Sequence, residues 1–174
     1  MQNEERQPIY YGKLEHNDWS MYLAATETGL CFVGSQEKEI DEVKNWVDKK
    51  RTGATLVHDE EKLMAYKEQF ISYLNGENPT FDVPIDLEGT PFQEAVWKEL
   101  QKIPYGKTVS YMDIANKIEK PKAVRAVGAA IGANPVMIIV PCHRVLAKDG
   151  KLTGFRGGIP MKEKLLMVER EAKA

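Results

Sequence analysis

Cysteine is scarce in this sequence, with only Cys31 and Cys142 among 174 residues. Such a pair cannot form the disulfide framework that stabilises many small secreted domains. Long apolar runs are absent as well, since none approaches the roughly 18 residues that a membrane-spanning helix requires. The polar, acidic start MQNEERQPIYYGKL does not resemble a secretory leader. These absences predict a globular protein of the reducing cytoplasm, with no membrane partner.

Histidine is also scarce, and His16, His58 and His143 lie far apart in the sequence. Structural zinc sites need cysteines and histidines at short, regular spacings. His16, Cys31 and His58 show no such spacing, so we expect no bound metal and no cofactor. The sequence also contains no internal repeat and no low-complexity tract. We expect a monomer, because nothing in the sequence signals an oligomer.

Charge is divided unevenly between the two halves of the chain. Residues 1–89 hold 9 Lys and Arg against 18 Asp and Glu, a net charge of −9. Residues 90–174 hold 15 against 8, a net charge of +7. This asymmetry favours a second half that meets a polyanion such as DNA. The alternative is that two solvated surfaces merely differ in composition.

The first half reads as a small sheet with two helices. Apolar and β-branched runs predict strands, and the apolar spacing of later segments predicts helices. The residues from 77 to 89 carry two prolines and no helical period, which indicates an extended linker. We therefore predict an N-terminal α/β support domain over 1–80 and a second domain over 81–174. The expected strands begin at Ile9, Ser20 and Leu30, and the expected helices cover 37–50 and 61–76.

The second half reads as mainly helical. Two helices start with capping boxes, Thr90 with Gln93 and Ser110 with Asp113. The short helix after Ser110 and the following helix, rich in small residues, fit a helix-turn-helix, although any two consecutive helices look similar. The run at 147–151 predicts a hairpin turn. The expected helices cover 90–103, 110–118, 123–134 and 158–174.

The segment IIVPCHRVL from Ile138 carries the chemistry of interest. Pro141 and the apolar run before it predict that Cys142 ends a buried, extended segment and faces a cavity. Burial raises the pKa of a thiol, so His143 would have to serve as its base, with Glu169 orienting the histidine. Adjacent residues of a strand point to opposite sides, so His143 would reach the sulfur through a bend or a water molecule. A buried cysteine is also commonly a plain core residue, and a Cys–His pair would equally allow a hydrolase.

At this point the sequence resembles the O6-alkylguanine-DNA alkyltransferases, the methylated-DNA–protein-cysteine methyltransferases. The resemblance is close over residues 90 to about 170 and is looser in the first half. It implies a mixed α/β (α+β) fold with a ribonuclease H-like N-terminal domain and a helical C-terminal domain that contains a helix-turn-helix. The motifs that carry it are KAVRAVGAA at 122–130, GANPVMIIV at 132–140, PCHRV at 141–145, GFRGG at 154–158 and KEKLLMVE at 162–169.

The resemblance implies DNA repair by direct reversal of damage. Cys142 would take the alkyl group from O6-alkylguanine, and from O4-alkylthymine, in one irreversible turnover. His143 would draw the thiol proton through a water molecule, and Glu169 would orient His143. Asn134 would hold the turn between the recognition helix and the nucleophile. Tyr111 would serve the flipped nucleotide, by donating to the lesion base or by crowding its phosphate.

The implied partner is double-stranded DNA, bound through its minor groove with the damaged base flipped out. Small residues on a helix allow close approach to that narrow groove. Arg125 would fill the gap in the base stack, and the neighbouring small residues would face the DNA. The residues expected to contact DNA or the flipped base are Arg125, Ala126, Gly128, Ala129, Val145, Phe155 and Arg156.

Two further functions compete with this interpretation. Alkyltransferase-like relatives flip damaged guanine without repairing it, but they lack the cysteine that Cys142 supplies here. A plain helix-turn-helix repressor would bind a specific sequence, as a dimer, and would be indifferent to Cys142→Ser. Alkyl transfer differs from both, because it requires the thiol.

Overall fold

The computed structural model describes residues 7–152 and 154–173. The chain forms two compact units. The first unit contains the chain up to Ile71 together with Asp82–Asp86, and the second contains Ser72–Phe81 and the chain from Leu87 onward. Around the boundary predicted at residue 80, the chain therefore passes from the first unit to the second, back to the first and again to the second. The first of these passages falls inside helix α2 (Met64–Leu74).

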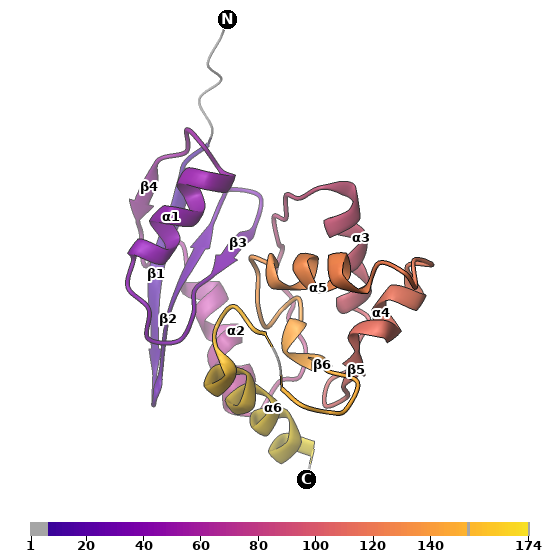
Figure 1. Cartoon of the computed structure of the whole chain (residues 1–174). Helices are drawn as coiled ribbons and strands as arrows, with labels where there is room; N and C mark the ends of the chain where they lie inside the picture. The colour runs from indigo at the N-terminus through magenta and orange to yellow at the C-terminus, as the bar shows by residue number, and fades with distance from the viewer. Residues whose placement is uncertain (1–6, 153, 174) are drawn as a thin grey trace, which may run out of the picture. The chain divides into compact units, whose positions relative to one another are not determined.

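The first unit is built on a four-stranded sheet (Figure 1). Its strands are β1 (Ile9–His16), β2 (Trp19–Ala25), β3 (Leu30–Val33) and β4 (Leu56–His58), in the order β3-β2-β1-β4. β1 and β2, and β2 and β3, pair antiparallel, whereas β4 runs parallel to β1. The three predicted strands are confirmed. β4 was not predicted, because three residues, two of them exposed, give no readable alternation.

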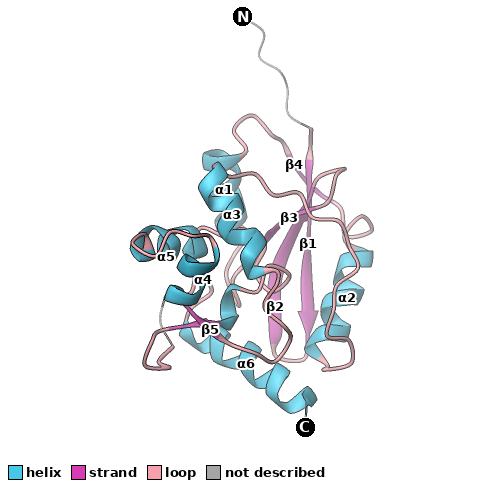
Figure 2. Ribbon diagram, turned by 90° about the vertical axis from the view of Figure 1, so that its right-hand side faces the viewer, coloured by secondary structure: helices cyan, strands magenta, loops and turns pink. Residues whose placement is uncertain are grey.

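Two helices cover opposite faces of this sheet, as Figures 1 and 2 show. Helix α1 (Asp41–Lys50) packs Val43 and Val47 against Ile9, Ala24 and Phe32. Helix α2 contributes the buried side chain of Phe70, with Leu63 just before its start. Both helices were predicted from their apolar spacing, and both lie within the predicted ranges.

Part of the segment interpreted as a linker belongs to the first unit. Leu30 donates its backbone N–H to Pro84 O at 3.0 Å, and Asp86 donates to Leu30 O at 2.8 Å. Arg51 binds the Asp86 carboxylate, with Nη2 at 3.3 Å from Oδ1. A Cβ on Gly29 would lie 2.7 Å from Pro84 backbone atoms, so this approach requires glycine. The linker interpretation is therefore wrong for residues 82–86.

The second unit is mainly helical. It contains α3 (Pro91–Leu100), α4 (Tyr111–Lys117), α5 (Val124–Gly132) and α6 (Ile159–Lys173), with a short parallel pair of β5 (Val109–Ser110) and β6 (Val145–Leu146). Both predicted capping boxes are present, at Thr90 and at Ser110. Trp97 of α3 is buried and donates Nε1–H to Ala130 O at 2.8 Å, which fixes α3 against α5. The predicted mixed α/β fold class is confirmed.

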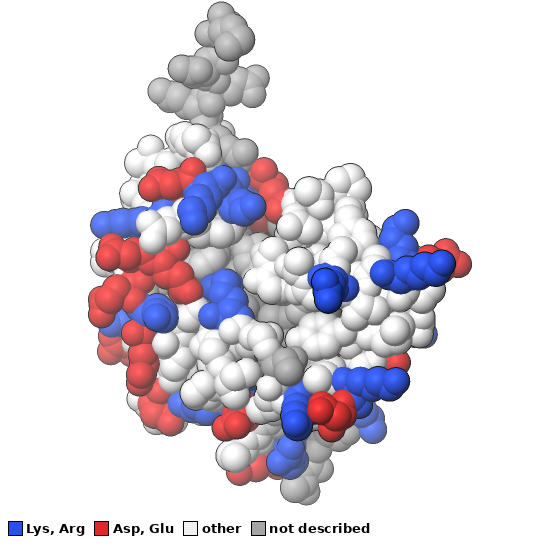
Figure 3. Space-filling view, viewed as in Figure 1, with Lys and Arg blue, Asp and Glu red and all other residues white. Residues whose placement is uncertain are grey.

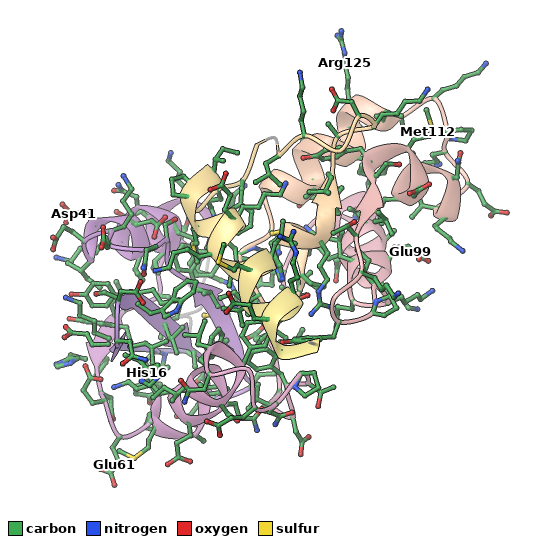
Figure 4. The ribbon with its side chains drawn as sticks, turned by 90° about the horizontal axis from the view of Figure 1, so that it is seen from below. His16, Asp41, Glu61, Glu99, Met112 and Arg125 are labelled. Carbon is green, nitrogen blue, oxygen red and sulfur yellow. The ribbon has the colours of Figure 1, made fainter. Side chains whose placement is uncertain are left out.

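Helices α4 and α5 form the predicted helix-turn-helix arrangement. Lys120 donates its backbone N–H to Ala115 O at 2.9 Å, and Glu119 has a φ of 61°, which turns the chain sharply after α4. Val127 of α5 is buried, whereas Arg125 is exposed. Figure 4 shows the Arg125 side chain extending away from the ribbon of α5. The fold thus leaves one side of α5 open to solvent.

The segment before Cys142 differs from the prediction. Instead of an extended run, residues 136–140 form a tight turn in which Val140 donates its N–H to Val136 O at 3.0 Å. Ile138 adopts a φ of 77°, a left-handed conformation that β-branched residues rarely take. Cys142 then begins a single 3₁₀ turn, η1 (Cys142–Arg144). The turn at 147–151 is present, but β6 pairs parallel with β5, so no hairpin with β6 forms.

Candidate active site

Cys142 lies in a nearly closed environment in the second unit. Only 4% of its surface is exposed. Burial raises the pKa of its thiol, and a hydrogen bond with the Asn134 side chain and the charges of Arg156 and Lys162 offset part of that rise. The resting side chain is therefore a neutral thiol. A base must take its proton before the sulfur can act as a nucleophile.

The Asn134 side chain shapes the turn that presents Cys142. Its Nδ2 donates to Val140 O at 2.8 Å, and its Oδ1 accepts from the Val136 N–H at 3.0 Å. Asn134 is fully buried, so these bonds are made away from water. They satisfy backbone groups that a strand partner would otherwise take, which explains why an apolar, β-branched run forms a turn here.

His143 and Glu169 form a buried pair. His143 Nε2 lies 2.6 Å from Glu169 Oε2, and the two side chains are 0% and 1% exposed. Burial lowers the pKa of His143, although Glu169 opposes the change, so the imidazole is neutral. Nε2 therefore donates its proton to Glu169, and Nδ1 carries the lone pair. Among the described residues Nδ1 has no hydrogen-bond partner, so it is free to accept a proton.

Glu169 collects several donors from separate parts of the second unit. Arg144 donates through Nε to Oε1 at 2.9 Å and through Nη2 to Oε2 at 2.9 Å. The Gly106 backbone N–H donates to Oε1 at 2.9 Å, and the Tyr73 hydroxyl donates to Oε2. Burial alone would raise the pKa of Glu169, but these partners and His143 lower it to about 2. The carboxylate is therefore ionised at neutral pH.

Sequence reasoning missed two members of this cluster and left a third open. Tyr73 follows the apolar spacing of the helix predicted over 61–76, and its hydroxyl, which needs a partner when it is buried, is the signal that the sequence offers. Lys162 is fully buried and donates Nζ–H to Val145 O at 2.7 Å; a lysine beside a buried apolar face was the only signal. The sequence alone leaves the role of Arg144 open; in the structure it also donates Nη1–H to Ile103 O at 2.7 Å.

The residues expected to meet DNA fall into two groups. On α5, Arg125, Ala126 and Ala129 are exposed, and Gly128 is half-buried beneath the Tyr111 ring. A Cβ on Gly128 would lie 3.9 Å from Tyr111 Cδ1, which places α4 and α5 in contact there. Lys and Arg side chains stand around α4 and α5 in Figure 3, whereas acidic side chains crowd the strands of the first unit.

The second group is expected around the guanine, and one of its members, Arg156, acts on Cys142 through its charge. Val145 is completely buried in β6, so its side chain belongs to the packed interior and not to an open surface. Phe155 and Arg156 are half-buried, and Arg156 donates Nη2–H to Pro135 O at 3.1 Å. That bond ties the 154–158 loop to the residue after Asn134. The roles of both groups stay predictions.

The described residues give no indication of a metal site or of a membrane-spanning helix. The described part of the chain contains no group of three His, Cys, Asp or Glu side chains arranged to hold a metal ion. None of the described helices combines the length and apolar character needed to cross a bilayer.

Comparisons with known proteins match both units. The family model for the 6-O-methylguanine DNA methyltransferase ribonuclease-like domain matches residues 9–87, and the model for the DNA binding domain of the same family matches residues 91–171. The inducible methylated-DNA--protein-cysteine methyltransferase of Bacillus subtilis is 54% identical, with 95% of this chain and 93% of the relative covered. The enzyme of that name from Methanosarcina acetivorans is 42% identical, with 92% and 98% covered.

Solved structures give the same result. The crystal structure of Mycobacterium tuberculosis OGT in complex with DNA superimposes with a TM-score of 0.78, at 39% identity and with 94% of each chain covered. A crystal structure of the M. tuberculosis O6-methylguanine methyltransferase superimposes with a TM-score of 0.78, at 40% identity, again covering 94% of each chain.

Proposed function

Because this chain belongs to the O6-alkylguanine-DNA alkyltransferase family, whose members repair DNA by alkyl transfer to a protein cysteine, we propose that Cys142 accepts the alkyl group of O6-alkylguanine in DNA. The observation that carries the assignment to Cys142 is the chain of buried partners behind it. His143 offers a free Nδ1, and Glu169 holds the opposite nitrogen. The sequence-based identification of the family and of its enzyme class is confirmed.

The proposed reaction is a displacement at the alkyl carbon. The Cys142 thiol passes its proton to His143 Nδ1 through a water molecule, and the sulfur forms a bond to the carbon as the bond from carbon to guanine O6 breaks. Glu169 stabilises the imidazolium that forms. Tyr111 donates a proton to the departing guanine, and solvent returns one from His143 to Tyr111. The products are S-alkylcysteine and intact guanine.

Each protein molecule would act once. The alkyl C–S bond of a neutral thioether resists displacement by water, and nothing in the proposed chemistry regenerates the thiol. Transfer from O4-alkylthymine would follow the same steps, since its alkyl carbon is also bonded to an exocyclic ring oxygen. The thiol must stay reduced to react, so we expect the protein to work in the cytoplasm, where thiols persist. We also expect it to work as a monomer.

The DNA step would use α4 and α5. A base inside a duplex is out of reach of a buried thiol, so it must be flipped out, at a cost of a few kcal/mol. Arg125, which is exposed, would fill the vacated stack, and the small exposed residues Ala126 and Ala129 would permit close approach to the minor groove. In this proposal residues 81–174 bind DNA and transfer the alkyl group, and residues 1–80 support them.

The guanine itself would enter beside the nucleophile. Val145 would form a wall of that pocket, and Phe155 and Arg156 would line its rim. Tyr111, packed on Gly128, would stand between the pocket and the phosphate of the flipped nucleotide.

The test is intact-protein mass spectrometry after mixing equimolar protein with a duplex that holds one O6-methylguanine, followed by peptide mapping. We expect one added methyl group on the peptide that contains Cys142, and unmodified guanine in the DNA. Cys142→Ala should bind the lesion without transfer. Cys31→Ala is the control: Cys31 is a buried thiol whose Sγ–H donates to Ala24 O at 3.5 Å in the sheet, so transfer should persist.

Three other outcomes would reject the proposal. An unmodified protein that still binds the lesion would indicate a damage sensor. Repeated turnover on an ester would indicate a hydrolase. Transfer retained by Cys142→Ala would mean that another residue is the acceptor.

A further inference from the structure

Tyr73 is a buried hydroxyl that the proposed reaction does not use. It lies on α2, 96 residues from Glu169 in the sequence, and its side chain is 0% exposed. Its hydroxyl donates to Glu169 Oε2 and lies 3.3 Å from His143 Nε2. Glu169 Oε2 therefore accepts hydrogen bonds from both the tyrosine and the histidine.

The aromatic ring of Tyr73 is held by packing that does not involve the hydroxyl. The Phe81 ring lies 5.3 Å away, centroid to centroid, and the Tyr105 ring meets it edge-on at 5.9 Å. Because these two rings pack against Tyr73, the position of its hydroxyl oxygen is set by the packing of the ring. Removing only the hydroxyl should leave this packing intact.

The position of the Tyr73 hydroxyl affects whether His143 or Glu169 holds the proton between them. A short bond between a carboxylate and an imidazole can place its proton on either partner. If the pair took up one more proton, so that Glu169 was neutral and His143 held a proton on Nδ1, Nδ1 could no longer receive one from Cys142. The Tyr73 hydroxyl, a further donor on Oε2 beside His143 and Arg144, lowers the basicity of that oxygen and keeps the proton on Nε2.

We propose that Tyr73 is a positioning residue for alkyl transfer: its hydroxyl keeps Glu169 ionised and holds His143 in the tautomer whose Nδ1 is a free base. The proposal rests on the proposed function for its kinetic consequence, but the tautomer is a property of the protein alone. The Tyr73 hydroxyl stays protonated throughout, since burial and Glu169 raise its pKa well above 10.

Other charged and titratable groups also face the pair, and they set the background against which Tyr73 acts. Arg144 donates to both oxygens of Glu169, and Lys162 places a buried charge near Cys142 and His143. Arg144 belongs to η1 and Lys162 to α6, whereas Tyr73 donates to Oε2 from α2. Among the described residues, the groups that act on Glu169 or His143 include Tyr73, Tyr105, Arg144 and Lys162.

The experiment compares wild type with Tyr73→Phe and with the control Tyr105→Phe. Tyr105 belongs to the same aromatic cluster, but its hydroxyl is not a donor to Glu169 in the described structure. The first readout is the single-turnover rate of methyl transfer from duplex O6-methylguanine across pH 5–9. The second is the ¹⁵N chemical shifts of the His143 ring in DNA-free protein over the same range.

We expect Tyr73→Phe to transfer about 10- to 100-fold more slowly, the usual cost of losing a hydrogen bond to a charged group. The acid limb of its pH profile should move to higher pH, because a less satisfied carboxylate favours the imidazolium. Its ¹⁵N shifts should show a larger share of imidazolium, or of the Nδ1–H form, at neutral pH. Tyr105→Phe should match wild type in both readouts.

The outcomes separate this proposal from the proposed function. If Tyr73→Phe keeps the wild-type pH profile and ¹⁵N shifts, Tyr73 is a packing residue and the proposal is wrong, whatever its rate. If wild type transfers no methyl group, the proposed function fails, and the ¹⁵N comparison still decides the role of Tyr73. Thermal unfolding of each variant confirms that a loss of rate is not a loss of fold.

Discussion

Asn134 and Val140 are joined by a buried hydrogen bond, from Asn134 Nδ2 to Val140 O at 2.8 Å. Two residues after Val140 the chain reaches Cys142, so this bond sets the position of the nucleophile. It also stabilises a turn in which Ile138 holds a left-handed conformation at a φ of 77°. A side chain thus imposes a backbone path that the local sequence would not choose.

Replacing Asn134 with Ala should destabilise the protein and slow transfer. The change leaves the buried Val136 N–H unpaired, at a cost of about 1–3 kcal/mol, and the Val140 carbonyl keeps only its bond from the Cys142 N–H at 2.8 Å. Urea denaturation and the single-turnover rate measure the two effects. Asn116→Ala, at an exposed position on α4, is the control and should be neutral. Full transfer by Asn134→Ala would show that the turn keeps its shape without the side chain.

The stability of the protein should depend on the Glu169 charge. Its pKa of about 2 lies below the ordinary 4.5, so its contribution to stability is complete above pH 4.5 and is lost as the pH falls towards 2. We expect Glu169→Gln to lower the free energy of unfolding by about 2–4 kcal/mol at pH 7, because the buried Arg144 loses its counter-charge. The deficit should shrink below pH 4.

Urea denaturation of both proteins at pH 7, 5 and 3.5 measures this convergence. Glu171→Gln, at an exposed position on the same helix, should change stability little at every pH. A deficit for Glu169→Gln that stays constant down to pH 3.5 would contradict the assigned charge.

Cys142 should be a slow thiol in the free protein. Burial raises its pKa, and 4% exposure limits access, so iodoacetamide at pH 7.5 should modify it at least about ten times more slowly than an unhindered cysteine. Peptide mapping distinguishes Cys142 from Cys31. Protein unfolded in urea should react at the ordinary rate. Rapid modification of the native protein at pH 6 would mean that the resting group is a thiolate.

Arg125→Ala should impair repair of duplex DNA more than repair of a short single strand. The exposed side chain is proposed to stabilise the flipped state, which a single strand reaches without unpairing. We expect a loss of about tenfold on duplex and little loss on the single strand, measured as single-turnover rates. Lys122→Ala, an exposed neighbour, should weaken both substrates alike and in a salt-dependent way. Equal losses for Arg125→Ala would argue against the proposed role.

Local signals in the sequence predicted the elements that local bonds determine. The capping boxes at Thr90 and Ser110 fixed the starts of α3 and α4, and their side chains make those bonds in the structure. The pairing of His143 with Glu169 followed from reading a cysteine beside a histidine, together with a family motif. In both cases the interacting residues can be identified from the sequence alone.

The remainder depends on contacts that no local pattern encodes. The run before Cys142 has the composition of a strand, but the two bonds of Asn134, together with the backbone bond from Val140 N–H to Val136 O, hold it in a turn. Strand β4 exists because β1 accepts it as a parallel neighbour, not because three residues favour a strand. Tyr73 fits a buried helical stripe equally well with or without a polar partner, so its bond to Glu169 could not be predicted.

The distances in sequence between the partners of Glu169 have a consequence for folding. Tyr73, Gly106 and Arg144 lie 96, 63 and 25 residues from it. Contacts of such high contact order form only as the chain condenses as a whole. A partly folded molecule would carry Cys142 and His143 without the assembled Glu169 site, and Cys142 would then be an ordinary thiol. Competence for repair is in this sense a cooperative property, acquired and lost together with the tertiary structure of the second unit.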